Sequence, residues 1–182
     1  DAGSCEFFSP LPQAHSRRRL LIESALRGAI DRRELFLVYQ PRVASDTLDL
    51  CGAECLARWH HPEYGTVHPA EFIPIAEETG IIKDIDDWVM RAACEAAVKW
   101  SLPLKIAVNV SARAICHAGI VDSVRNILIE TGLPPSRLEI EVTEGSLVED
   151  KDLARELLTG LREAGVRIAI DDFGTGYSSL YH

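Results

Sequence analysis

The sequence predicts a fold of the α/β class with a largely parallel sheet. Short apolar runs of strand length, such as Ile106–Asn109 and Arg167–Asp171, alternate with longer segments whose apolar residues recur at helical spacing, such as Asp84–Trp100. Parallel strands need connections of helix length, and this alternation supplies them. Side chains with oxygen atoms also stand near the ends of several strands, where α/β folds place their functional sites.

Residues 1–34 are expected to form a linker followed by an amphipathic helix. Asp1–Gln13 contains proline, serine and glycine, which is typical of a linker. Over about Ser16–Arg33, apolar residues recur at helical spacing among charged ones, which predicts a helix. The folded domain is then expected to span residues 35–182.

Two strands are expected next. Leu35–Gln40 is predicted to stop at Pro41, because proline has no amide hydrogen to donate to a sheet. Leu50–Trp59 is predicted as the second strand, and the turn-forming residues of His60–Gly65 follow it.

The rest of the chain alternates helices and strands. Helices are predicted where apolar residues recur every three or four positions, and strands where a short aliphatic run stands between turn-forming residues. The expected helices are Pro69–Glu78, Asp84–Trp100, Ile120–Glu130 and Lys151–Ala164, and the expected strands are Ile106–Asn109, Leu138–Val142 and Arg167–Asp171.

The composition narrows the possible functions. The chain has 182 residues, 47% of them hydrophobic, and a formal net charge of −9, which suits a globular core and does not suit binding to a nucleic-acid polymer. Five cysteines without a Cys-x-x-Cys pair support neither a disulfide framework nor a zinc site, so a cytoplasmic location is expected. No apolar run approaches the roughly 20 residues that span a bilayer, and a parent protein tethered to a membrane stays open.

Two adjacent carboxylates, Asp171 and Asp172, follow the last predicted strand and lead into a loop with Gly174 and Gly176. Like charges held together at a strand end repel, and a divalent cation would remove that repulsion. The glycines let the backbone turn so that both carboxylates reach one site. A solvated acidic loop is the alternative interpretation of this pair taken alone.

Other strands carry further oxygen ligands. Asn109 and Glu141 stand near the ends of predicted strands, and Glu54 lies within the second strand. Because side chains alternate along a strand, Asn109 shares a face with the small residue Ala107 beneath it. Together with Asp171, these carboxylate and amide oxygens at one rim of a parallel sheet suit Mg²⁺ or Mn²⁺ rather than zinc.

Six short segments carry a resemblance to a known family. They are Tyr39–Pro41, Gly52–Trp59, Pro69–Pro74, Asn109–Ser111, Glu141–Glu144 and Asp171–Gly176. In this order they resemble the successive motifs of the EAL-domain family of bacterial cyclic di-GMP phosphodiesterases. Each segment alone is a weak signal, but six in one order are not expected by accident.

The resemblance implies a variant TIM (β/α)₈ barrel that hydrolyses cyclic di-GMP to the linear dinucleotide with two metal ions, Mg²⁺ or Mn²⁺. It implies that the first metal is held by Glu54, Asn109, Glu141 and Asp171. Asp171 would also bridge to the second metal, and Asp172 would serve that second metal.

The resemblance also implies roles outside the metal ligands. Arg58 would contact a substrate phosphate, and Gln40 would contact a guanine. Glu144 would brace the loop Asp172–Leu180, which in this family couples the metal site to dimer contacts, so a homodimer through that loop is expected. Glu54, Asp171, Asp172 and Glu144 are thus the expected catalytic residues. An upstream GGDEF or sensory domain is a further possibility that the resemblance raises.

The chain departs from the family pattern in two ways. The signature Glu-Ala-Leu reads Glu54-Cys55-Leu56, an exchange of small residues that is expected to be tolerated. A (β/α)₈ barrel typically needs about 250 residues, so the chain resembles a barrel truncated after the fifth or sixth strand. The family's later lysine, glutamate and glutamine have no counterpart before His182.

The truncation leaves two functions open. The leading one is a phosphodiesterase in the intact domain, with residues 1–182 by themselves expected to bind metal weakly without turnover. The alternative is a degenerate or truncated EAL domain that binds cyclic di-GMP or mediates dimerisation without turnover.

Overall fold

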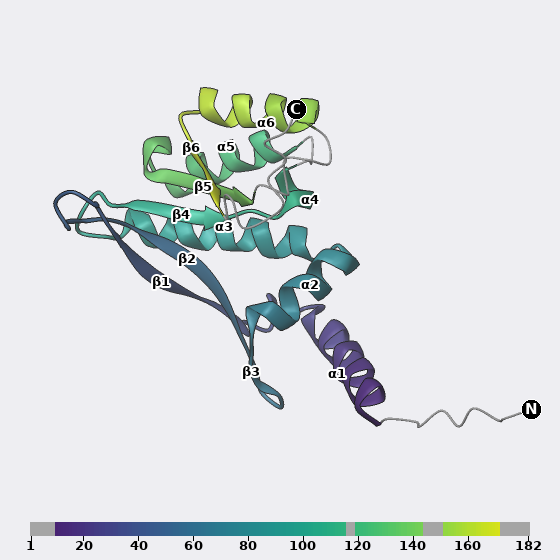
Figure 1. Cartoon of the computed structure of the whole chain (residues 1–182). Helices are drawn as coiled ribbons and strands as arrows, with labels where there is room; N and C mark the ends of the chain where they lie inside the picture. The colour runs from purple at the N-terminus through teal and green to yellow at the C-terminus, as the bar shows by residue number, and fades with distance from the viewer. Residues whose placement is uncertain (1–9, 116–118, 144–150, 172–182) are drawn as a thin grey trace, which may run out of the picture.

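A six-stranded sheet forms the centre of the structure, a computed structural model that describes residues 10–115, 119–143 and 151–171 (Figure 1). The strand order is β1-β2-β4-β5-β6, and β3 pairs with β2 beside this path. β2, β4, β5 and β6 are parallel, whereas β1 and β3 run antiparallel to β2. The strands are β1 Leu35–Val43, β2 Leu50–His61, β3 Gly65–Val67, β4 Lys105–Asn109, β5 Leu138–Thr143 and β6 Arg167–Asp171. The expected α/β class with a largely parallel sheet is therefore confirmed.

Helices connect the parallel strands and stack along one side of the sheet (Figure 1). They are α1 Pro10–Leu26, α2 Pro69–Thr79, α3 Ile82–Val98, the single turn α4 Ala112–Ile115, α5 Ile120–Thr131 and α6 Lys151–Glu163, with a 3₁₀ turn, η1, at Pro135–Arg137. None of the helices in the described ranges combines the length and the hydropathy that crossing a membrane requires.

The first strand does not stop at Pro41, as the sequence had predicted, but continues to Val43. Pro41 lies opposite Ala53 in the β1–β2 register. Among the described strands β1 pairs with β2 alone, and an edge strand tolerates a residue that cannot donate a hydrogen bond on its open side. The consequence is that Arg42 joins the sheet.

The first helix also differs from the prediction in both of its ends. It begins at Pro10, since proline is well tolerated in the first turn of a helix, and it ends at Leu26 rather than Arg33. Gly28 then adopts a positive φ of 84°, which no helix continues through. Ile22 and Leu26 on α1 are at most 2% exposed and join the core.

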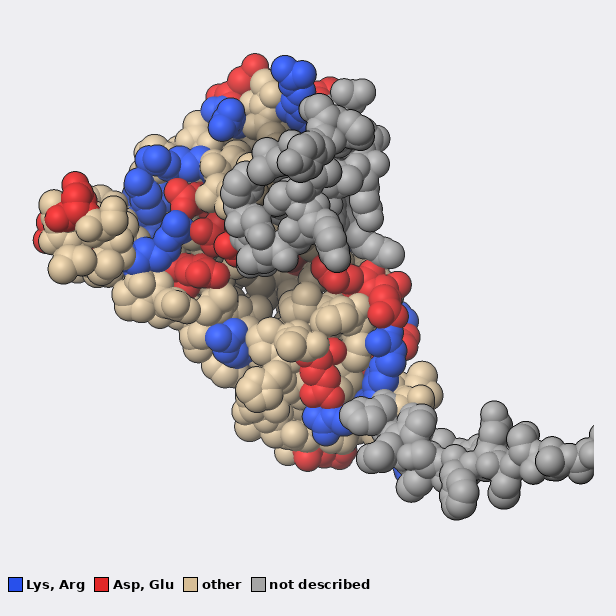
Figure 2. All heavy atoms as spheres, viewed as in Figure 1, with Lys and Arg blue, Asp and Glu red and all other residues tan. Residues whose placement is uncertain are grey.

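The sheet has one apolar face and one polar face. Toward the helices it presents side chains that are at most 2% exposed, among them Cys55, Ile106, Val108, Leu138 and Ile140. Alternation along the strands, fixed by their register, gives the opposite face its polar residues: Gln40, Arg42, Glu54, Arg58, Lys105, Asn109, Glu139, Glu141, Arg167 and Asp171. We call this the polar face. Acidic and basic side chains stand next to one another over the region of β4, β5 and β6 (Figure 2).

Gly52 sets how closely β2 approaches β4. A Cβ atom at this position would lie 2.8 Å from the backbone oxygen of Lys105, its partner in the parallel register. Backbone cannot move aside as a flexible side chain can, so Gly52→Ala should destabilise the fold by about 1–3 kcal/mol. Chemical denaturation of this variant beside Cys51→Ala, an exposed neighbour expected to be near neutral, measures the effect. Equal stability of the two variants would contradict the close approach.

Candidate active site

The register of the sheet brings the predicted metal ligands to one rim of the polar face. Asn109 at the end of β4 lies directly beside Glu141 of β5. Asp171 at the end of β6 lies beside Thr143, two residues beyond Glu141 on the same face. Glu54 of β2 lies beside Ala107, two residues before Asn109. Residues from four parallel strands therefore lie along one rim, with Glu54 within β2 and the other three at or near the carboxyl ends of β4, β5 and β6.

Asn109 and Glu54 are joined directly. The Asn109 Nδ2 donates a hydrogen bond to Glu54 Oε1 over 2.9 Å, across the boundary between β2 and β4. The amide group has one donor end and one acceptor end, so this bond leaves the Asn109 Oδ1 for another partner. An amide oxygen and a carboxylate held side by side are ligands that hard divalent cations accept.

Glu141 lies deepest among these side chains. It is 7% exposed, and its Oε1 accepts a hydrogen bond from Arg42 Nη1 over 2.8 Å. The same Arg42 nitrogen donates to Glu139 Oε1 over 2.7 Å, and Arg167 Nε lies 3.7 Å from Glu139 Oε2. The floor of the polar face is therefore a network of two arginines and two glutamates below the rim.

Negative charge exceeds positive charge around Glu141. Burial raises the pKa of the Glu141 carboxyl, and the Arg42 guanidinium opposes part of that rise. Three neighbouring carboxylates raise the pKa further: Glu54, Asp171 and Glu139. A divalent cation at the rim would relieve this repulsion, and the oxygen-only donor set is the kind that Mg²⁺ and Mn²⁺ bind. The residues present therefore fit the expected metal.

The predicted ligands are nevertheless not grouped closely around one point. Within residues 10–115, 119–143 and 151–171, no three acidic, histidine or cysteine side chains are grouped tightly enough to hold a metal ion. Glu54 and Glu141 instead bond to Asn109 and Arg42. Small side-chain rotations that bring the remaining oxygen atoms of Glu54 and Glu141 toward one point, with both of these bonds kept, would be needed to close the site.

The predicted substrate residues take different positions. Gln40 of β1 is exposed and lies opposite Glu54 in the antiparallel register, so it borders the predicted metal ligands. Arg58 is on the same face of β2 but four residues beyond Glu54, about 13 Å further along the strand. Its Nη1 donates to the backbone oxygen of Ala57 over 2.8 Å. The structure therefore brings Gln40 to the ligands and holds Arg58 above them.

Asp86 of α3 fixes the loop that follows Asn109. Its Oδ2 accepts hydrogen bonds from the hydroxyl and the backbone amide of Ser111, over 2.6 and 3.2 Å. Burial raises the pKa of the Asp86 carboxyl to about 6, although both bonds from Ser111 lower it. Val110, which lies between Asn109 and Ser111 in the sequence, donates a hydrogen bond from its backbone amide to the backbone oxygen of Glu141 over 2.9 Å. Asn109 is thus held from both sides.

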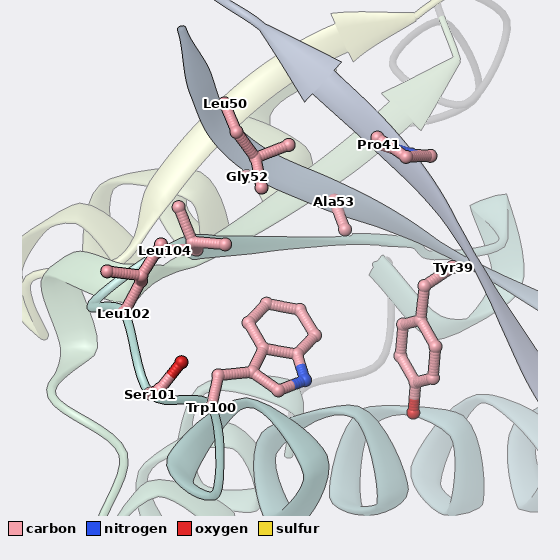
Figure 3. Close-up of a pocket in the computed structure, with 9 residues that line it drawn as sticks. All are labelled: Tyr39, Pro41, Leu50, Gly52, Ala53, Trp100, Ser101, Leu102 and Leu104. Atoms are coloured by element: carbon pink, nitrogen blue, oxygen red, sulfur yellow. The ribbon is translucent and has the colours of Figure 1, made fainter.

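A separate cavity of about 370 Å³ lies on the helix side of β1 and β2 and is mainly apolar (Figure 3). The indole of Trp100 points toward Tyr39, and the two rings meet edge to face with centroids 5.7 Å apart. Burial raises the pKa of the Tyr39 phenol, which keeps it neutral. Among the described residues that line this cavity none is basic, so no positive charge there favours a phosphate.

Comparison with known sequences identifies the family of the chain. The profile of the EAL domain matches residues 23–182. The chain belongs to the EAL domain family. MucR of Pseudomonas aeruginosa, a bifunctional diguanylate cyclase and cyclic di-GMP phosphodiesterase, is 44% identical over 184 residues, which cover 99% of this chain and 27% of MucR. The cyclic di-GMP phosphodiesterase PA2567 of the same organism is 39% identical over 181 residues, covering 97% of this chain and 31% of PA2567. The chain spans about a quarter of the length of the curated relatives it matches.

Solved EAL domains share the fold described above. The MucR phosphodiesterase in complex with cyclic di-GMP superposes with a TM-score of 0.81 at 45% identity, covering 87% of this chain and 66% of that one. The EAL enzyme Bd1971, with cAMP and cyclic di-GMP bound, gives a TM-score of 0.80 at 26% identity, covering 91% and 47%. EAL domains are TIM barrels, so the expectation of a partial TIM barrel is confirmed.

Some expected EAL residues lie outside the described ranges. Glu144, Asp172 and the loop Asp172–Leu180 are among them. The Cys55 of the altered signature faces the helices at 2% exposure, and burial raises the pKa of its thiol to about 12. A thiol that stays protonated in the core acts as a small apolar residue, in keeping with the expectation that the exchange is tolerated.

The sequence prediction missed Arg42 and Asp86. Arg42 stands two residues after Gln40, so period-two alternation would have placed it on the polar face had the strand not been ended at Pro41. No sequence pattern indicated Asp86, since an acidic residue on an amphipathic helix is expected to face solvent. Only the packing of α3 against the loop after β4 buries it.

Asp86 should make stability depend on pH. Its pKa is about 6 when folded and near 3.8 otherwise, so the folded state binds more protons between these values. Its contribution to stability is therefore fully present below about pH 4 and is lost as the pH rises through 6. The side chain in Asp86→Asn stays neutral and can still accept a hydrogen bond from Ser111. As the pH rises from 4 to 7, the free energy of unfolding of this variant should therefore exceed that of the wild type by up to about 3 kcal/mol.

Thermal unfolding at several pH values measures this gain, with Asp84→Asn, at an exposed position of the same helix, as a control for removing a carboxylate from α3. A stability difference between Asp86→Asn and the wild type that is constant with pH would show that Asp86 is not protonated on folding.

Proposed function

We propose that this EAL domain hydrolyses cyclic di-GMP to the linear dinucleotide with Mg²⁺ or Mn²⁺. The observation that carries the proposal is the convergence of Glu54, Asn109 and Glu141 at one rim, with Asp171 close enough to raise the pKa of Glu141. The names of relatives such as MucR and PA2567 support the substrate.

The chain's own residues would divide the work. Glu54, Asn109, Glu141, Asp171 and, beyond the described ranges, Asp172 would hold two divalent cations, which when bound supply a water activated at neutral pH. Asn109 would present its amide oxygen while its nitrogen keeps Glu54 in place. Glu144 is the proposed brace of the following loop.

Binding of a dianionic nucleotide by an acidic domain needs local compensation. Arg58 can offer its planar guanidinium to a phosphate, and the exposed amide of Gln40 can bond to the polar edge of a guanine. Because Gln40 lies opposite Glu54 and Arg58 lies further along β2, one guanine would lie beside the metal ligands and a phosphate would lie toward the end of β2.

Three further parts of the proposal concern context. The loop Asp172–Leu180 would form a homodimer contact, and an upstream GGDEF or sensory domain would regulate the site, as the bifunctional name of MucR suggests. The buried free thiols of Cys55 and Cys94 suit the reducing cytoplasm in which a cyclic dinucleotide messenger would be hydrolysed.

Hydrolysis should depend on the metal and on its ligands. The protein that carries this chain should convert cyclic di-GMP to the linear dinucleotide with Mg²⁺ or Mn²⁺, and excess chelator should abolish turnover. Asp171→Asn should cost more than the roughly 10–100-fold that is typical of losing a residue behind a ligand. Glu130→Gln, the same kind of change at an exposed carboxylate of α5, should have no effect.

Chromatographic separation of the cyclic and linear dinucleotides gives the rates. Full turnover in excess chelator would contradict a metal-dependent mechanism. Tight binding of cyclic di-GMP without any turnover would instead favour the alternative, a domain that senses the nucleotide.

Arg58 should affect the nucleotide and spare the metal. Loss of one charge-assisted hydrogen bond to a phosphate in Arg58→Ala should weaken cyclic di-GMP binding by roughly 1.5–3 kcal/mol. Mn²⁺ affinity should not change, because Arg58 lies well beyond Glu54 on β2. Calorimetric titration with each ligand separates the two effects. An equal fall in both affinities would make Arg58 a structural residue of the rim.

A further inference from the structure

Arg42 joins two strands that are not neighbours in the sheet. It lies on β1, and its two carboxylate partners, Glu139 and Glu141, lie on β5. Between them stand β2 and β4, so β1 and β5 are three strand spacings apart, about 14 Å in a flat sheet. Side chains that stand perpendicular to a flat sheet would not meet across that gap. The contact therefore requires the sheet to curl around its polar face.

Small residues leave room for this contact. Gly52, the cross-strand neighbour of Arg42, has no side chain, and Ala107 lies on β4 between Glu54 and the network. Arg42, Gly52, Ala107 and Glu139 line one small hollow of the polar face, together with Lys105. The guanidinium can therefore pass over β2 and β4 to reach β5.

The contact fixes one side of Glu141. Among the described residues, Arg42 is the basic side chain that forms an ion pair with Glu141, and it bonds to Oε1. A buried carboxylate with one oxygen fixed below keeps its other oxygen, Oε2, for a partner above. Asn109 lies directly beside Glu141, so that partner would lie at the rim where the metal is proposed.

We propose that Arg42 is a positioning residue for the metal site: it holds Glu141 from below so that this carboxylate is oriented to bind the rim metal. The inference rests on the proposed function, because it assumes that Glu141 is a metal ligand. Residues behind a metal ligand typically set 10–100-fold of the metal affinity by fixing the orientation of that ligand.

A second effect of Arg42 has the opposite sign, which makes the proposal testable. A guanidinium close to a cation site repels the cation, so its removal would tighten metal binding if charge alone mattered. Positioning predicts that the same removal weakens binding. At a pH where the Glu141 carboxylate stays ionised with and without Arg42, the direction of the change in affinity therefore decides between the two.

The test is a titration of the purified protein with Mn²⁺ in the absence of nucleotide, with free Mn²⁺ followed by electron paramagnetic resonance. Arg42→Met should raise the dissociation constant about 10-fold or more. Arg42→Lys, which keeps a positively charged donor on the same face of β1, should restore most of the affinity. Arg167→Met is the matched control, since Arg167 approaches Glu139 on the same face but forms no ion pair with Glu141, and it should bind Mn²⁺ like the wild type.

Circular dichroism checks that each variant folds, and Arg42→Gln replaces the methionine variant if that one does not, with the same loss expected. Mn²⁺ binding by Arg42→Met that equals or exceeds wild-type binding would overturn the positioning role. An equal loss in Arg167→Met would overturn it as well, because the network as a whole would then matter. A wild-type protein that binds no Mn²⁺ would overturn the proposed function itself.

Discussion

Repulsion among carboxylates on one face of a parallel sheet is the constraint on which this structure depends. Side chains of the same face recur every second residue, so β5 alone presents Glu139 and Glu141 together. Burial makes their repulsion stronger, because less water screens the charges. Arg42 and Arg167, from strands on either side of β4 and β5, balance the lower part of the face, and the rim above remains acidic.

This division has a functional consequence. The floor of the polar face is neutralised by Arg42 and Arg167, whereas the described rim residues Glu54, Asn109 and Asp171 offer oxygen atoms to the proposed metal. The apolar core behind the sheet makes the arrangement rigid, since the helix-facing residues Ile106, Val108, Leu138 and Ile140 are all fully buried. Strands that cannot shift hold their side chains in a fixed order along the rim.

Hydrogen bonds from the helices also fix the position of a loop that follows the sheet. Asp86 reaches from α3 to Ser111, so the position of Asn109 depends on a helix on the far side of the sheet. The aromatic cavity between Tyr39 and Trp100 lies on that helix side as well. The apolar groups thus lie behind the sheet, and the charged groups lie on its polar face. Family membership agrees with this reading, because the EAL domain match includes both the strands and the connecting helices.

The sequence by itself determined the alternation of helices and strands, the last described strand to its residue bounds and the shared face of the four residues predicted to bind metal, because periodicity and strand-end position are local properties that six ordered motifs reinforce. It also determined the family. Only the tertiary structure decided that β1 continues through Pro41, because the cost of proline in a strand depends on whether that strand has a neighbour on both sides. The pairing of Arg42 with Glu141, 99 residues away, was decided there too. Curvature of the sheet brings them together, and curvature is a property of how the strands assemble rather than of any one segment.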